Sequence, residues 1–257
     1  MSHKNLNAVN WDHPKRVAVV ISNPTVSTTT KWPVGFWWSE LTHPYFAFTE
    51  LGYEVEIFSP DGGACVADAM SDPEDASQWQ AGDVIGRGYK HDPDLLDLIE
   101  NTESVETVSL EPFDAPVVAG GQGPMFTMEN AASLHVKFVE FYGAGTIVAA
   151  LCHGVAVLGY TTLSTGDLLV KGKTVTGFAN IEEDPSDDAT WSMGALPEGT
   201  HIMPWRIEDE MKKPGATYIQ AGLWKGFAIR VGNLVTGQQN FSESETANAI
   251  IKALGEW

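Results

Sequence analysis

The stretch TIVAALCHGVAVLGY, residues 146–160, places a cysteine between two apolar segments. Its first six residues are apolar or β-branched, which predicts a buried strand over residues 146–151 and a helix that begins directly after it. A sharp turn between a strand and a helix crowds the positions two before and two after the cysteine. Both residues there, Ala150 and Gly154, are small. The pattern predicts a nucleophile elbow with Cys152 at its tip.

The rest of the chain repeats this alternation of strands and helices. We expect further strands at the apolar runs 16–22, 54–60 and 115–121, and helices over 38–52, 92–101, 127–145 and 242–257, with Thr127 as the N-cap of the third. Segments 173–178 and 226–238 complete the pattern, and the polar, acidic residues 64–92 are expected to form a surface excursion.

The predicted strands are continuous apolar runs, which are typical of a sheet covered on both faces. Strands that alternate with helices imply right-handed crossovers and mostly parallel pairing. We therefore expect an α/β fold with a doubly wound, mostly parallel sheet flanked by helices and carrying surface insertions. No repeat or composition break divides the chain, so we expect a single domain over residues 1–257, with residues 1–15 as an N-terminal extension.

Composition excludes several classes of function. A formal net charge of −19 argues against nucleic-acid binding, which requires basic surfaces. Two cysteines are too few for a disulfide framework in 257 residues, and residues 1–16 lack the apolar core of a signal peptide. No run approaches the ~20 apolar residues that span a bilayer. We expect a cytoplasmic protein without membrane contact and, because the histidines lack ligand spacing, without an essential metal.

The predicted elbow has consequences for the chemistry of Cys152. The N-terminus of the following helix is expected to lower the thiol pKa and favour the thiolate. The backbone N–H of His153 would point at the same place and stabilise an oxyanion, and Gly121 in the glycine-rich strand end 120–124 is the natural second donor. A buried cysteine packed as a small apolar residue, with a tight turn at the glycines, is the alternative. Cys65 has no activating group in its acidic surroundings, so Cys152 is expected to be the fast-reacting thiol.

Glu40 is a candidate proton shuttle. It lies in a helix-forming stretch with aromatic neighbours, GFWWSELTHPYF (35–46), which predicts partial desolvation and a raised carboxyl pKa. The alternative is a solvated glutamate on an exposed helix face.

Seven segments occur in an order that resembles one protein family. They are VGFWWSELTHPY (34–45), SPDGG (59–63), AGGQGPM (119–125), ALCHG (150–154), KTVTGFANIEED (173–184), MPWRIEDEMKKPGATY (203–218) and LVTGQQNFSE (234–243). The chain resembles the ThiJ/PfpI superfamily, which has the class I glutamine amidotransferase-like, flavodoxin-like fold. More narrowly, it resembles the glyoxalase III and heat-shock holding-chaperone branch.

The resemblance implies roles for particular residues. Cys152 matches the family's nucleophile, Glu40 its proton-shuttling helical glutamate, and His153 the histidine after the nucleophile. The acid that orients this histidine matches Glu183, with the adjacent Glu182 as the alternative if the loop is shifted by one residue.

One departure qualifies the resemblance, and one activity of the wider superfamily is not expected. Many relatives carry histidine where this chain has Gln122, which retains the backbone donor but changes the side chain offered to a substrate. A glutamine amidotransferase needs a distal His-x-Glu, and here His201 is followed two residues later by Met203. Amidotransferase activity is therefore not expected.

The resemblance implies a homodimeric, cofactor-independent lyase of the D-lactate dehydratase type that converts 2-oxoaldehydes such as methylglyoxal to 2-hydroxy acids such as lactate. A related protein deglycase activity is included in this expectation. Three alternatives stay open. The first is a holding chaperone with an exposed aromatic patch at Trp32, Phe36, Trp37 and Trp38, although aromatic stripes are more often core. The second is a redox sensor in which an exposed Cys152 of low pKa is oxidised to a sulfinate, and the third is another hydratase or hydrolase with an elbow cysteine.

Overall fold

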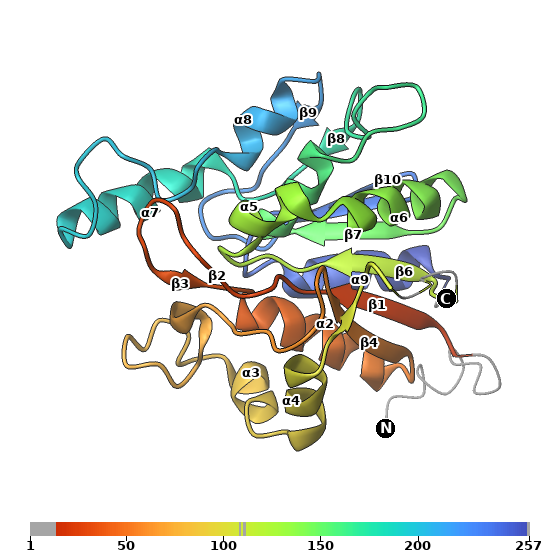
Figure 1. The fold of residues 1–257 in the computed structure, drawn as a ribbon, viewed down its shortest axis with the longest axis horizontal. Helices are drawn as coiled ribbons and strands as arrows, with labels where there is room; N and C mark the ends of the chain where they lie inside the picture. Colours follow the sequence, from red (N-terminus) through yellow and green to blue (C-terminus); the bar gives the residue numbers. More distant parts are fainter. Residues whose placement is uncertain (1–13, 108, 110–111, 256–257) are drawn as a thin grey trace.

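The computed structural model describes residues 14–107, 109 and 112–255. Within these residues, seven strands form one sheet in the order β10-β11-β7-β6-β1-β4-β5 (Figure 1). They are β1 (Arg16–Val20), β4 (Glu54–Ser59), β5 (Glu103–Ser104), β6 (Ala115–Val118), β7 (Val148–Leu151), β10 (Ala228–Val231) and β11 (Leu234–Gly237). β10 and β11 are antiparallel, while the other neighbours are parallel. The predicted doubly wound, mostly parallel α/β fold is confirmed.

Helices cover both faces of this sheet. α2 (Trp38–Glu50), α4 (Pro93–Glu100) and α9 (Glu243–Ala253) pack on one face, and α5 (Pro124–Thr127), α6 (Ala132–Gly143) and α8 (Ile207–Lys212) on the other (Figure 1). In β1, Val17 and Val19 enter one core cluster and Ala18 and Val20 the other. Successive strand side chains point to opposite faces, so two covered faces require an apolar residue at every position.

The other described elements lie outside the main sheet. They are β2 (Thr25–Val26), β3 (Pro33–Val34), β8 (Thr174–Val175), β9 (Thr217–Tyr218), α3 (Val84–Tyr89), α7 (Asn180–Ser192) and the 3-10 helices η1 (Ala69–Ser71), η2 (Met128–Asn130) and η3 (Cys152–Gly159). The predicted segment 173–178 contributes only β8, which pairs with β9 rather than with the main sheet.

The predicted helix over 127–145 with Thr127 as its N-cap is wrong at its start. The chain forms α5, then η2, and α6 begins only at Ala132. Thr127 ends α5, and its hydroxyl donates back to the carbonyl of Gly123 at 3.0 Å, four residues earlier. Because this hydroxyl bonds backwards as within a helix, it does not cap a helix that follows.

The prediction of a surface excursion over 64–92 is also wrong in part. Cys65, Asp68 and Ser71 are buried, and the indole N–H of Trp38 donates to the carbonyl of Gly86 in α3 at 2.8 Å. Cys65 and Ala67 join the core cluster formed with β1 and α2, whereas Val66 between them is exposed. The segment is polar on average but is packed against its neighbours near both its start and its end.

Parts of two predictions lie outside the described residues. The N-terminal extension is described only at positions 14 and 15, and the last helix only as far as position 255. No helix in the described part of the chain combines the length and apolar character needed to cross a bilayer.

The start of η3 packs against the end of β6, which generates a prediction about Gly154. A Cβ atom at Gly154 would lie 2.6 Å from the carbonyl oxygen of Val118 and 2.7 Å from that of Ala119. Because both atoms belong to the backbone, Gly154→Ala should lower the free energy of unfolding by about 1–3 kcal/mol, as overpacking does. Urea unfolding measures this change.

Gly88→Ala is the matched control, because a Cβ at Gly88 in α3 meets nothing within 4 Å. This change should be neutral or stabilising by up to about 1 kcal/mol. Equal destabilisation by both substitutions would contradict the requirement for a small residue at 154.

Candidate active site

Cys152 lies at a strained backbone position between β7 and η3. Its φ is +55°, a left-handed conformation that side chains other than glycine rarely adopt, whereas Leu151 before it is extended. Ala150 is fully buried and Gly154 touches the end of β6. The structure thus forms the predicted elbow at the carboxyl end of a central strand, where α/β sheets bind ligands. The thiol residue is only 3% exposed.

Two backbone N–H groups donate to the sulfur of Cys152. They belong to Gly121, at the end of the neighbouring strand β6, and to His153. Gly121 has a φ of +102°, and a Cβ there would lie 2.5 Å from backbone atoms of Phe36 and Trp37. Glycine is therefore required at this close approach. The structure brings together at the sulfur the two donors expected from the sequence.

Glu40 is fully buried in the first turn of α2. Its carboxyl group hydrogen-bonds the Cys152 thiol, and its Oε2 accepts the N–H of Gly120 at 2.8 Å. Burial raises the pKa of Glu40 to about 8, an effect that these hydrogen bonds oppose and the charge of Asp68 increases. The alternative of a solvated helix-face glutamate is wrong. The predicted rise in pKa is confirmed, with complete rather than partial desolvation as its cause.

The expected lowering of the Cys152 thiol pKa is wrong. Burial, then the charge of Glu40 and its hydrogen bond, raise the thiol pKa well above its usual value, although the N–H groups of Gly121 and His153 lower it. Desolvation disfavours the thiolate more than the backbone dipoles favour it. The thiol and the Glu40 carboxyl titrate as a coupled pair, in which protonation of one favours ionisation of the other.

His153 lies between the thiol and a second carboxylate. Its Nδ1 is 3.7 Å from the sulfur, and its Nε2 is 3.0 Å from Oε1 of Glu183 at the start of α7. The ring stacks on Phe178 with centroids 4.2 Å apart. His153 and Glu183 are both almost completely buried. The imidazole ring is therefore contacted at one nitrogen by the sulfur, at the other by Glu183 and on one face by Phe178.

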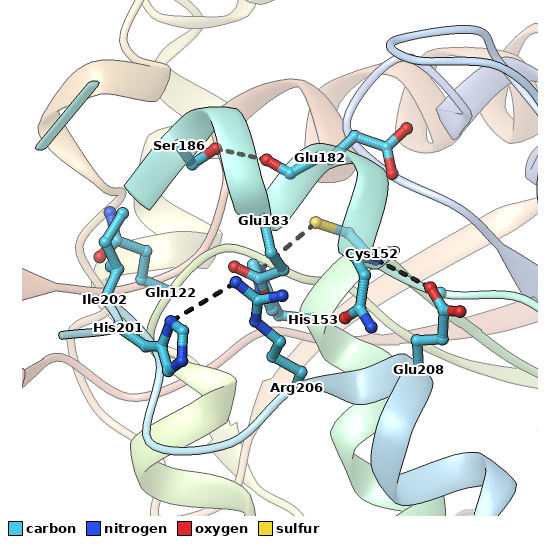
Figure 2. A network of polar contacts seen from close by, with 12 residues as sticks. Gln122, Cys152, His153, Glu182, Glu183, Ser186, His201, Ile202, Arg206 and Glu208 are labelled. Atoms are coloured by element: carbon cyan, nitrogen blue, oxygen red, sulfur yellow. Dashed lines mark hydrogen bonds and ion pairs between the residues drawn. The ribbon is translucent and has the colours of Figure 1, made fainter. Parts of the chain in front are cut away.

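Glu182 and Glu183 are adjacent but point in different directions (Figure 2). Oε1 of Glu182 accepts from the side-chain amide of Gln238 at 2.6 Å and from the N–H of Trp224 at 3.4 Å. It is Glu183 that contacts the imidazole of His153. The structure thus pairs His153 with Glu183, the acid that the resemblance favoured, and not with the adjacent Glu182.

This arrangement coincides with clear similarity to known proteins. A sequence profile of the DJ-1/PfpI family matches residues 34–253. The chain belongs to the DJ-1/PfpI family.

Several relatives in this family have descriptive names. Glyoxalase 3 of Candida albicans is 29% identical over 232 residues, which cover 83% of this chain and 87% of the relative. The glutathione-independent glyoxalase HSP31 of Saccharomyces cerevisiae is 28% identical over 217 residues, covering 84% and 87%.

Solved structures agree with this assignment. The Rapid Encystment Protein 24 KDa of Francisella tularensis has a TM-score of 0.81 at 28% identity, with 93% of this chain and 99% of that chain covered. Glyoxalase III from Candida albicans has a TM-score of 0.74 at 26% identity, covering 94% and 98%. The resemblance to the glyoxalase III branch is confirmed.

The polar contacts described for Gln122 do not include the Cys152 thiol. The backbone N–H of Gln122 donates to Oδ2 of Asp68 at 2.6 Å, and its side-chain amide oxygen is buried without a hydrogen-bond partner. His201, the late histidine considered for an amidotransferase dyad, pairs through Nδ1 with Asp187 at 2.7 Å, and Figure 2 shows it beside Arg206.

The structure speaks against one alternative left open by the sequence and corrects one expectation. Phe36 is fully buried and Trp38 is 7% exposed, so both belong to the core rather than to an exposed aromatic patch. Cys65 is buried as well, and burial raises the pKa of its thiol. Sequence reasoning missed Asp68 altogether. Only Cys65 and Ala67 nearby join the core, and Val66 is exposed, so the local pattern gives little sign of the burial of Asp68.

The buried carboxyl groups generate a prediction about pH. Unfolded Glu40 loses its proton near pH 4.5, whereas the folded protein retains it up to about pH 8, so between these values the folded state binds more protons. The free energy of unfolding therefore falls as pH rises through this window, by about 1.4 kcal/mol per unit for each such group. Asp68, with a pKa of about 7, and Glu243, with a pKa of about 8, act in the same direction.

Glu40→Gln should flatten this dependence by about one proton between pH 5 and 8. Urea unfolding of the parent and the variant at unit pH steps measures both slopes. Identical slopes would show that Glu40 does not carry its proton into the folded state at neutral pH.

Proposed function

We propose that this protein converts 2-oxoaldehydes such as methylglyoxal to 2-hydroxy acids such as lactate, without glutathione or another cofactor. The observation that carries the proposal is the buried Cys152–Glu40 pair with two backbone N–H groups aimed at its sulfur. The relatives named glutathione-independent glyoxalase and glyoxalase III support the substrate class. We further propose a cytoplasmic homodimer, on the resemblance alone; light scattering measures the oligomeric state.

In the first step, the sulfur of Cys152 attacks the aldehyde carbon C1. When the coupled pair holds one proton on Glu40, Cys152 is a thiolate with three hydrogen-bond donors. Addition breaks the carbonyl π bond and places negative charge on the aldehyde oxygen. The N–H groups of Gly121 and His153 stabilise this charge, and Glu40 protonates the oxygen to give a hemithioacetal.

In the second step, Glu40 moves a proton from C1 to C2. Its carboxylate removes the C1 proton to form an enediolate and then returns it to C2, while the proton of the C1 hydroxyl passes to the C2 oxygen. The product is a thioester of the 2-hydroxy acid, formed without net oxidation. A carboxyl pKa of about 8 suits this task, since proton transfer is most efficient when the pKa lies near the operating pH.

In the third step, water hydrolyses the thioester. His153 removes a proton from water, and the oxygen attacks the thioester carbonyl, with thiolate as the leaving group. Glu183 orients His153 and stabilises the imidazolium that forms, because its carboxylate lies 3.0 Å from Nε2. The imidazolium then returns its proton to the Cys152–Glu40 pair, so the three steps together add one water to the 2-oxoaldehyde and regenerate the pair.

The alternatives from the sequence receive less support. A redox sensor requires an accessible thiol with a low pKa, whereas Cys152 is 3% exposed and its pKa is raised. The aromatic patch invoked for a holding chaperone loses Phe36 and Trp38 to the core. Deglycase, hydratase and hydrolase reactions would use the same thiol, and substrate screening distinguishes them from the proposed reaction.

The reaction is tested with metal-stripped protein in glutathione-free buffer. We expect lactate from methylglyoxal with the parent and none with Cys152→Ala. Glu40→Gln retains the side-chain shape and one donor to the thiol, so alkylation at Cys152 should continue near the parent rate. Its turnover should fall at least about a hundredfold, the low end for losing a general acid–base group.

Two results would count against this proposal. Lactate formation by Cys152→Ala would exclude the thiol as nucleophile. Full turnover by Glu40→Gln would transfer the proton steps to His153 and Glu183.

The two adjacent glutamates of α7 provide an internal comparison. Glu183→Gln should lower turnover at least about tenfold, because His153 loses the carboxylate that fixes its tautomer. Glu182→Gln should stay within about threefold of the parent, since its carboxylate bonds Gln238 and Trp224 instead. Steady-state lactate formation measures both. The reverse order would assign the orienting role to Glu182.

A further inference from the structure

Asp68 is a buried carboxylate next to the active centre that the mechanism above leaves without a role. It is 2% exposed although it lies within residues 64–92, which the sequence predicted to be a surface excursion. Its N–H donates to the carbonyl of Phe36 at 2.8 Å, and the N–H of Phe36 donates to the carbonyl of Val66 at 3.3 Å. Asp68 is thereby fixed to the chain that leads into α2.

The two oxygens of Asp68 hold two different loops. Oδ1 accepts the N–H of Gly35 at 2.9 Å, and Oδ2 accepts the N–H of Gln122 at 2.6 Å. Gly35 belongs to the segment before α2, whereas Gln122 belongs to the loop between β6 and α5. Burying a carboxylate is unfavourable unless hydrogen bonds compensate, and these N–H groups provide two.

Four successive N–H groups of the loop after β6 each have a fixed acceptor. Those of Gly120, Gly121, Gln122 and Gly123 donate, in this order, to Oε2 of Glu40 at 2.8 Å, the sulfur of Cys152, Oδ2 of Asp68 at 2.6 Å and the carbonyl of Gly35 at 2.7 Å. The donor to the sulfur therefore lies between two donors held by buried carboxyl groups.

This arrangement matters because the loop turns at a glycine. Gly121 has a φ of +102°, in a region that glycine enters and leaves with little steric resistance. The orientation of its peptide groups therefore depends on what holds the neighbouring groups. Glu40 holds the N–H before Gly121, and Asp68 holds the N–H after it.

We propose that Asp68 is a positioning residue that, by accepting the N–H of Gln122, keeps the N–H of Gly121 aimed at the sulfur of Cys152. Asp68 touches neither the sulfur nor a substrate in this role and acts through the loop. Its effect on catalysis rests on the proposed function, in which the N–H of Gly121 stabilises the oxyanion. Its effect on the loop and the thiol does not.

Asp68→Asn tests the proposal, because asparagine has the same size but only one oxygen to accept two N–H groups. In hydrogen exchange followed by mass spectrometry, a peptide covering 119–125 should exchange faster than in the parent. Iodoacetamide should alkylate Cys152 about tenfold more slowly, since the thiolate loses a donor. For methylglyoxal, kcat should fall about 10- to 100-fold with KM within about threefold, because the donor acts mainly in the transition state.

Asp83→Asn is the matched control. Asp83 belongs to the same segment, its side chain is 5% exposed, and it accepts the N–H of Gly86 at 2.7 Å. That bond caps α3 and does not involve the loop after β6. Exchange over 119–125, alkylation of Cys152 and the kinetic constants should therefore match the parent.

Two results with a folded Asp68→Asn variant would overturn the proposal. One is parent-like exchange over 119–125 together with parent-like alkylation. The other is an equal rise of exchange in the strands β1 and β6, which would show a general loss of stability instead of a local one. If the parent itself makes no lactate, the proposed function fails, while exchange and alkylation still decide the role of Asp68.

A measurement on the parent keeps the proposal testable if Asp68→Asn does not fold. Residues 120–123 lie outside helices and strands, so their amides depend on the four bonds described above for protection. We expect protection factors above about 100 at Gly121 and Gln122. If these two amides exchange as fast as those of an unprotected loop, the proposal for Asp68 is overturned.

Discussion

The hydrogen bond between the Cys152 thiol and the Glu40 carboxyl is the interaction around which the rest of the site is arranged. Both groups are removed from water, and burial raises the pKa of each. Neither ionises independently, because a second negative charge in the same dry space is strongly unfavourable. The pair therefore exchanges one proton internally, which is the property that an isomerisation between C1 and C2 requires.

Three parts of the fold meet to form this pair. β6 and β7 are adjacent in the sheet, so the loops at their carboxyl ends, with Gly121 and Cys152, lie side by side. The first turn of α2 brings Glu40 against both loops. The neighbouring backbones approach so closely that only glycine fits at Gly121 and Gly154. These contacts exclude water and leave backbone N–H groups to compensate the buried charges.

The local features of the site could be predicted from the sequence. The apolar run 146–151 and the small residues Ala150 and Gly154 predict a strand, an elbow and a nucleophile at Cys152, since these constraints act within a few residues. The aromatic stretch around Glu40 predicts a desolvated carboxyl for the same reason. Strands that are apolar at every position, without alternation, predict a sheet covered on both faces. The structure confirms this, because the side chains of β1 enter both core clusters.

Only the tertiary structure decided which distant groups meet and how the charges balance. Adjacent acids at 182 and 183 are equivalent in sequence, but the direction of α7 presents Glu183 to His153 and Glu182 to Gln238. The direction of the Cys152 pKa shift also required the structure, because desolvation depends on everything packed around the sulfur. The burial of Asp68 also required the structure, because it depends on the segments that pack around this polar stretch and not on the stretch itself. Local propensity acts over a few residues, whereas burial and hydrogen-bond partners are set by segments that are far apart in the chain.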